Sequence, residues 1–390
     1  MSTLISSKNL YTKLQKQYSR KINLDLKRIS LALKKLDNIH KSIKNPINII
    51  GSDGKYSTLK SLQYFIQENK EKVSTFTSPH LYDVRHRFWF KDKFISIKEF
   101  KKNLKIIEKL KVKLTLFELL TLVYYISASK LKNVSYALVE AGLMFAGDST
   151  RVWDKPLCQI IVNVNKQHLE WTKTKTLREI CKQKVGYLSK KTTIYVGKQK
   201  PATMKIIKKI LKKNPSKKNY YGNAWTLKKA KGRMIYKDNK GKLILKSKKI
   251  FSDGIWQNVG LATKVARDFN ISKKNIVNAL ALNAVVGNGT RLAFPPIGGL
   301  IIAIYGAGPA LIFGAVLYAV SSVAFLAVTP SKIRQQISQR ISLLKQFYEG
   351  IHYVRHQPVV LGLILMNVLN VLMDARLNRI YGTLKFYMMI

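Results

Sequence analysis

The sequence predicts an α/β fold with a mostly parallel sheet over about residues 1–276, followed by an apolar helical segment over residues 277–390. Two observations support the first part: short apolar runs rich in β-branched residues alternate with longer stretches of helical periodicity. A third observation separates the two parts, because charged residues recur every few positions up to Ile276 and then almost disappear. With 390 residues, 46% of them hydrophobic, the chain can bury the cores of two or three domains.

The formal net charge of +50 does not by itself predict a nucleic-acid partner. Dense Lys and Arg favour phosphate backbones through counterion release. Here, however, the basic residues are scattered instead of forming a stripe with aromatic partners. Lys, Ile and Asn are all frequent, so part of the charge reflects a compositional bias. We therefore expect no nucleic-acid partner.

Cysteine usage and the N-terminus indicate a cytoplasmic protein. Cys158 and Cys181 are the only cysteines, which is too few for a disulfide framework or a zinc site. Residues 1–21 contain no apolar run of signal-peptide length. We therefore expect the first part of the chain to lie in the cytoplasm.

The first strand and helix are expected to flank a phosphate-binding loop. A short apolar strand at residues 45–50 leads into a glycine–lysine loop, and helical periodicity follows at residues 59–69. Backbone N–H groups at a helix start and a lysine ammonium can hold phosphate oxygens. The candidate ATP-binding residues are Gly51, Ser52, Asp53, Gly54, Lys55, Tyr56 and Ser57. An ordinary strand–helix turn remains open, because the common GxxxxGK[ST] pattern would need glycine in place of Ile49.

Polar residues follow two further predicted strands. The strand at residues 134–140 ends at Glu140, and the β-branched strand at residues 158–164 leads to His168. The carboxyl ends of strands in an open α/β sheet border the ligand crevice. Because magnesium prefers hard oxygen ligands, Glu140 is the acid expected to bind it.

These motifs, in this order, resemble the dihydrofolate synthase and folylpolyglutamate synthase family of Mur-type amide-forming ligases. The loop GSDGKYS at residues 51–57 is similar to the family loop Gly-Thr-Asn-Gly-Lys-Gly-Ser, and TSPHL at residues 77–81 is identical to a family segment. The resemblance covers about residues 10–276. It implies a Mur-ligase-type P-loop ATP-binding domain that uses ATP and Mg²⁺. The implied reaction adds L-glutamate to dihydropteroate or folate through an acyl phosphate.

The resemblance also implies residue roles. The implied catalytic residues are Lys55 and Lys184, and the implied magnesium ligands are Ser78, Glu140 and His168. Phe117 and Glu118 are implied to contact the pterin, and Asn258 is implied to contact ATP. Lys184 matches a lysine that is carbamylated in the family. Structural alternatives remain open for several positions: Ser78 as a turn cap before Pro79, Phe117 as a core residue, His168 as a packing or exposed residue, and Lys184 as an unmodified surface residue.

Some positions depart from the family pattern. Tyr56 replaces the third glycine of the loop, and Gln167 replaces an aspartate before His168. The Gly-Arg and Asp-Gly-Ala-His-Asn-Pro motifs of the family's C-terminal domain are expected from about residue 280 but do not occur in the sequence. These departures favour the alternative of an inactive ligase–transporter chimera.

The segment from residue 277 is membrane-like in composition. Arg291 is its only charged residue before Ser331, and residues 292–329 are long enough for two bilayer crossings. A third apolar run at residues 358–373 is marginally long enough. The segment resembles part of a major facilitator superfamily exporter, which implies membrane association through residues 292–373. A related membrane protein and a buried helical hairpin are the alternatives.

Overall fold

The computed structural model describes residues 2–18, 24–80, 83–230, 233–247, 250, 252–280 and 308. All of these except residue 308 belong to one compact unit, Met1–Phe294. The expected membrane-like segment lies outside the described residues, apart from its first few positions and residue 308. The predicted domain boundary after residue 276 therefore stays a prediction.

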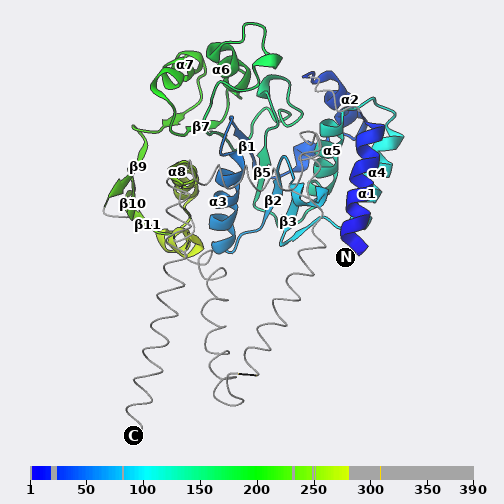
Figure 1. Ribbon diagram of the computed structural model, residues 1–390, viewed down its shortest axis with the longest axis horizontal. Coiled ribbons are helices and arrows are strands. Elements are labelled where there is room, and N and C mark those ends of the chain that lie inside the picture. Colours follow the sequence, from blue (N-terminus) through cyan, green and yellow to red (C-terminus); the bar gives the residue numbers. More distant parts are fainter. Residues whose placement is uncertain are drawn as a thin grey trace. The chain divides into compact units, whose positions relative to one another are not determined.

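A mostly parallel sheet forms the centre of this unit (Figure 1). Its strands follow the order β4-β3-β2-β5-β1-β6-β7-β8. Their bounds are β1 (Pro46–Ile50), β2 (Val73–Phe76), β3 (Phe88–Lys91), β4 (Lys93–Phe94), β5 (Tyr136–Glu140), β6 (Cys158–Ile161), β7 (Thr193–Val196) and β8 (Lys218–Tyr220). The run from β2 to β8 is parallel, whereas β3 and β4 pair antiparallel at one edge. The predicted α/β class with a mostly parallel sheet is confirmed.

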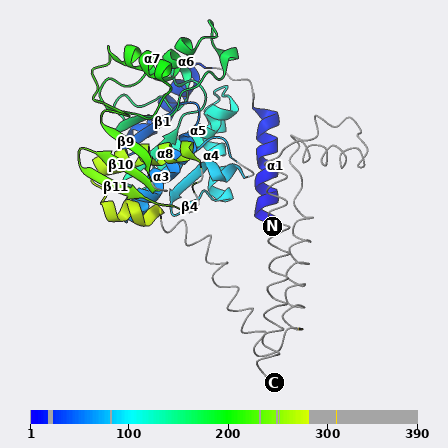
Figure 2. The same ribbon diagram turned by 60° about the vertical axis from the view of Figure 1, so that its left-hand side comes forward.

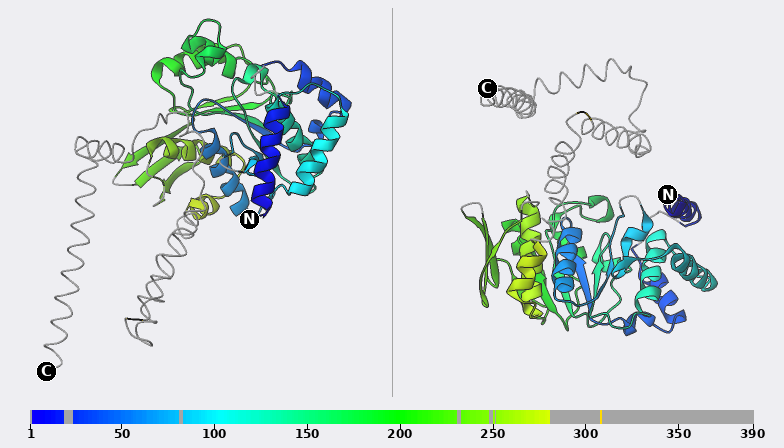
Figure 3. Two further views of the ribbon diagram at one scale, coloured as in Figure 1. Left: turned by 45° about the vertical axis from the view of Figure 1, so that its right-hand side comes forward. Right: turned by 90° about the horizontal axis from the view of Figure 1, so that it is seen from below.

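Helices cover both faces of the sheet (Figures 2 and 3). Their bounds are α1 (Ser2–Gln17), α2 (Lys27–Lys35), α3 (Lys55–Glu68), α4 (Ile97–Lys109), α5 (Leu116–Ala128), α6 (Leu177–Val185), α7 (Pro201–Leu211) and α8 (Asp253–Asp268). Helices α3 and α8 lie side by side on one face. A small antiparallel sheet of β9 (Trp225–Ala230), β10 (Arg233–Asp238) and β11 (Gly241–Leu245) packs against α8. The pairs α4–α5 and α6–α7 cover the other face.

Strand alternation explains how one sheet supports cores on both faces. Ile47 and Ile49 of β1 pack into the core shared with α3, α8 and the small sheet, whereas Ile50 packs with α6 and α7. Val139 of β5 packs with α5, and its neighbour Leu138 packs toward α3. Successive side chains of a strand point to opposite faces, so both faces need apolar residues. The continuous apolar runs in the sequence satisfy this requirement.

One predicted strand ends early, for a reason connected with the site. The strand expected over residues 158–164 ends at Ile161, and the chain then bends toward the glycine–lysine loop. The carbonyl of Asn163 accepts the N–H of Ser52 at 2.8 Å. The Asn165 N–H donates to the Ser52 hydroxyl at 3.0 Å. These residues brace the loop instead of extending the sheet.

Within the described ranges, no helix combines the length and the apolar character needed to cross a bilayer. The expected crossings over residues 292–373 lie outside these ranges.

Candidate active site

The glycine–lysine loop links the central strand β1 to the start of α3. Gly51 and Gly54 adopt φ angles of 148° and 91°, and α3 begins directly afterwards at Lys55. Gly54 lies in the left-handed region that favours glycine, and a Cβ there would lie 2.3 Å from the Asn258 amide nitrogen. The sequence context of strand, loop and helix is therefore matched by the structure.

Two lysines bind the same carbonyl of the loop. The Lys55 ammonium donates to the carbonyls of Gly51 and Ser52 at 3.3 and 3.1 Å. The Lys184 ammonium, on α6, donates to the carbonyls of Gly51 and Leu143 at 3.0 and 2.7 Å. Lys184 is only 2% exposed, so the surface alternative for this residue is wrong. Burial, and secondarily the nearby Lys55 charge, lowers the pKa of Lys184 to about 8.

Ser78 and Glu140 meet at the carboxyl ends of the neighbouring strands β2 and β5. The Ser78 N–H donates to Glu140 Oε2 at 3.0 Å. Glu140 is 3% exposed, and this desolvation raises the pKa of its carboxyl to about 7. The Ser78 N–H and the charges of Lys55 and Arg87 oppose this rise. A buried carboxylate of this kind would gain from a cation beside it.

Arg87 is a site residue that the sequence did not single out. Its guanidinium donates to the Ser78 hydroxyl at 3.0 Å and to His80 Nδ1 at 2.9 Å. The chain returns from β2 into β3 as an antiparallel pair, and the Thr77 N–H donates to the Arg87 carbonyl. This pairing brings Arg87 next to Ser78, so the serine hydroxyl contacts the arginine. The sequence feature that could have identified Arg87 is a basic residue just before the strand that pairs with β2, opposite the TSPHL segment.

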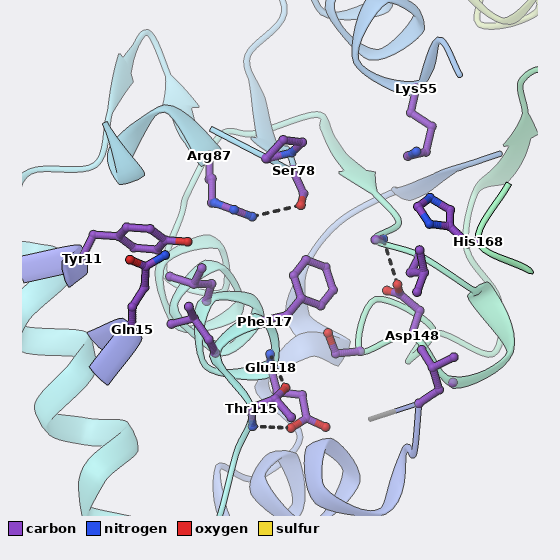
Figure 4. A pocket seen from close by; sticks show the side chains of 18 residues that line it. Tyr11, Gln15, Lys55, Ser78, Arg87, Thr115, Phe117, Glu118, Asp148 and His168 are labelled. Atoms are coloured by element: carbon purple, nitrogen blue, oxygen red, sulfur yellow. Dashed lines mark hydrogen bonds between the residues drawn. The ribbon is translucent and has the colours of Figure 1, made fainter. Parts of the chain in front are cut away.

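A cavity of about 480 Å³, which we call the aromatic cavity, opens beside Lys55 (Figure 4). Its lining includes Tyr11, Gln15, Lys55, Ser78, Arg87, Phe117, Glu118, Asp148 and His168. Lys55 and His168 lie at one end, and Tyr11 and Gln15 of α1 lie at the other, with the Phe117 ring between them. Nine of the fourteen predicted site residues are not in this lining, but one of them, Glu140, contacts the lining residue Ser78.

The two predicted pterin contacts have different surroundings. The Phe117 ring projects toward the aromatic cavity and also lies 5.9 Å from the Phe76 ring. Glu118 is 4% exposed and forms a capping box with Thr115 at the start of α5. It also binds the Arg28 guanidinium through both carboxylate oxygens, at 2.9 to 3.1 Å. Glu118 therefore has structural partners in addition to its place in the lining, whereas Phe117 is half-buried in the cavity wall.

His168 and Gln167 approach the loop from the segment after β6. The His168 side chain is 44% exposed, lines the aromatic cavity and lies 3.6 Å from a Glu170 oxygen. The Gln167 amide donates to the Asp53 carboxylate at 3.1 Å. An aspartate at position 167 would repel Asp53, so glutamine is the compatible residue in this chain.

Asn258 contacts the other side of the loop. Its amide, on α8, donates to the Ser57 hydroxyl at 2.8 Å, although 201 positions separate the two residues. It lines a second cavity of about 500 Å³, which we call the amide cavity. The amide cavity is lined by Asp53, Gly54, Val162, Asn163, Gly197, Lys198, Gln199, Lys200, Pro201, Gly254, Gln257, Asn258 and Leu261. Tyr56 is 52% exposed, so its ring does not fill the loop.

The glycine–lysine loop lies at the carboxyl end of a central strand of a mostly parallel sheet, between two cavities, which is where open α/β sheets hold their ligands. The apo form of L. casei folylpolyglutamate synthase has this fold, with a TM-score of 0.62 and 20% identity over 70% of this chain and 71% of that one. E. coli FolC in complex with DHPP and ADP gives a TM-score of 0.61 and 20% identity over 72% of this chain and 66% of that one.

Sequence comparison finds enzymes of the same kind in other organisms. The chain is 24% identical to the dihydrofolate synthase/folylpolyglutamate synthase of Bacillus subtilis over 47% of this chain and 44% of that protein. It is 29% identical to the folylpolyglutamate synthase of Arabidopsis thaliana over 54% of this chain and 34% of that protein. The matches span less than half the length of these relatives. No family model matches the chain. The comparisons support the resemblance to this family but give no support to the exporter resemblance.

Proposed function

We propose that this chain is an ATP-dependent ligase that joins L-glutamate to dihydropteroate or folate. One observation carries the proposal: Ser78 and the buried Glu140 contact each other beside the Lys55 loop, at the carboxyl ends of adjacent parallel strands. The structural neighbours include a folylpolyglutamate synthase complex with AMPPCP and folate, with a TM-score of 0.62 and 20% identity. ATP and a folate-type acid are therefore the substrates that we expect.

The two cavities suit the two parts of this reaction. The amide cavity offers glycines and side-chain amides around Asn258, which suit the uncharged base and ribose of ATP. The aromatic cavity offers the Phe117 ring for a flat pterin and ends at Lys55. A pterin stacked on Phe117 would direct its carboxylate toward the loop. The γ-phosphate would lie between the cavities.

The reaction then follows from position and charge. A carboxylate oxygen of the pteroate attacks the γ-phosphorus, the bond to the bridging oxygen breaks, and ADP leaves. The amine of glutamate attacks the acyl carbon, phosphate leaves, and the amine proton passes to solvent. The Lys55 ammonium and the loop N–H groups would stabilise the transferring charge, and the aromatic cavity would hold the carboxylate in line.

The residues present fit a magnesium ion in part. The Ser78 hydroxyl and the Glu140 carboxylate are hard oxygen donors at one place, and the buried carboxylate lacks a full countercharge. His168 lines the same cavity as Ser78. These three residues would hold the ion, which would neutralise phosphate charge when bound. Arg87 donates to the Ser78 hydroxyl and would have to turn away to free it.

Lys184 would supply a further anion if it were carbamylated. A carbamate forms when the unprotonated amine attacks the carbon of carbon dioxide and releases a proton. Burial lowers the pKa of Lys184 to about 8, so a usable share of the amine is unprotonated near neutral pH. The new carboxylate would lie beneath Gly51, close to the proposed phosphate position.

The test uses the full chain with ATP, magnesium, dihydropteroate and radiolabelled L-glutamate. We expect label in the folate product and equal release of ADP, and both should be lost in Glu140→Gln, which removes the acid but keeps the shape. Glu108→Gln, on the exposed face of α4, is the matched control and should retain the activity. ATP binding without label in any product would contradict the ligase proposal.

A further inference from the structure

A third cavity lies where the edges of the two sheets meet. It has a volume of about 940 Å³, and it shares no lining residue with the aromatic or the amide cavity. We call it the basic cavity. It is lined by Thr193, Tyr195, Lys217, Asn219, Asn223, Ala224, Trp225, Thr226, Lys228, Lys237, Asp238, Asn239, Lys240, Lys264 and Asp268. These residues come from β7 and the edge strand β8, from β9 and β10, and from the end of α8.

The charge of the basic cavity is strongly positive once internal pairs are counted. Asp238 accepts two hydrogen bonds from Arg267, at 2.8 and 2.9 Å, and Asp268 accepts from Lys264 at 2.8 Å. The two carboxylates are thus already neutralised. Within the described ranges, the other lining lysines form no ion pair; they are Lys217, Lys228, Lys237 and Lys240.

Two buried donors in the same lining lack partners. The side-chain N–H groups of Asn219 and Trp225 have no hydrogen-bond acceptor among the described residues. These side chains are 7% and 1% exposed, so burial deprives them of water. An unpaired buried donor costs about 1–3 kcal/mol. Most buried polar groups in folded proteins are paired, and two exceptions in one cavity therefore point to an absent acceptor.

We propose that the basic cavity binds an oligophosphate group. Among the described residues it offers four ammonium groups without an ion pair and the two unpaired N–H donors of Asn219 and Trp225, which suit a ligand rich in hydrogen-bond acceptors. Lysine ammonium groups bind phosphate as point charges and impose no fixed planar geometry on the ligand. The described lining contains five lysines and no arginine. A nucleotide and a free oligophosphate share this chemistry.

The experiment follows the Trp225 indole N–H by NMR in the full chain carrying Lys55→Ala, which removes the loop lysine as a competing phosphate contact. The chain has five tryptophans, and Trp225→Phe identifies the signal that belongs to Trp225. Tripolyphosphate and ATP are titrated separately. We expect a saturable shift of the Trp225 signal with tripolyphosphate; a shift with ATP alone would identify a nucleotide as the source.

Paired variants make the result specific. Lys228→Ala with Lys237→Ala removes two lysines of the basic cavity and should weaken binding by about tenfold or more. Lys101→Ala with Lys102→Ala removes the same charge from the exposed face of α4 and should leave binding unchanged. No shift with either ligand, or equal weakening by both pairs, would overturn the proposal. Because the readout is the Trp225 signal and the loop lysine is absent throughout, neither outcome depends on ligase activity.

Discussion

The aromatic and amide cavities border the same loop but differ in the groups they offer. The aromatic cavity contains an ammonium, a guanidinium, an imidazole and two carboxylates, and the buried Glu140 lies next to it. The amide cavity has glycines and side-chain amides around Gly54 and Asn258. Its charged residues lie on the solvent-facing loops that line it and are Asp53, Lys198 and Lys200. Charged groups change with pH, whereas glycines and amides respond to shape. We therefore expect proton-sensitive effects on one side of the loop and steric effects on the other.

The largest effect is expected from Gly54→Ala, on the amide side. The added Cβ would lie 2.3 Å from the Asn258 amide nitrogen, and the φ of 91° is itself strained for alanine. We expect the free energy of unfolding to fall by about 4 kcal/mol, as both a clash and backbone strain are introduced. Urea unfolding measures this change, and calorimetry should show loss of ATP binding.

Gly222→Ala is the matched control for Gly54→Ala. Its φ is 92°, but no heavy atom lies within 4 Å of the added Cβ. It should cost only the backbone strain, about 1–2 kcal/mol. Equal losses in the two variants would show that contact with Asn258 does not matter.

On the aromatic side, Glu140 should make stability depend on pH. Its pKa is raised to about 7, so the folded state binds the proton more tightly than the unfolded state. The contribution of Glu140 to stability should then fall as pH rises from about 4.5 to about 7, by about 3 kcal/mol in total, and stay level above that range. In Glu140→Gln this fall should be absent. Unfolding curves at pH 5 and pH 8, compared with Glu108→Gln, provide the measurement, and parallel pH profiles in all three proteins would refute the assignment.

Lys55 lies between the two cavities and should affect ATP more than stability. Lys55→Ala removes an ammonium that now binds two loop carbonyls and would bind phosphate. We expect ATP affinity to fall by about 10- to 100-fold, as is typical for loss of a charged hydrogen bond. Calorimetry with Lys101→Ala as the control tests this, and unchanged affinity would exclude Lys55 from the nucleotide site.

The smallest effect is expected at Tyr56. The tyrosine is 52% exposed, so Tyr56→Ala should change stability by less than about 0.5 kcal/mol. ATP affinity should change by less than about threefold. A large gain in affinity on truncation would show instead that the ring obstructs the phosphate position.

Local sequence patterns determined much of this fold. Continuous apolar runs predicted β1, β5 and β6, because strands covered on both faces need apolar residues throughout. The glycine–lysine loop was placed correctly between a strand and a helix, since glycine tolerates the positive φ that the turn requires. Parallel strands align their carboxyl ends, so Ser78 and Glu140 could be expected at one edge of the sheet.

Contacts between distant segments could only be decided by the tertiary structure. Glu118 lines the aromatic cavity, but only the fold shows that it also pairs with Arg28, 90 positions away. Lys184 is indistinguishable in sequence from many surface lysines, yet α6 buries it beneath Gly51. Arg87 reaches Ser78 because β3 folds back on β2. The residue type determines whether a side chain can carry a charge, but its partner and its burial depend on which segments pack together. Those long-range contacts set the side chain's pKa and its role.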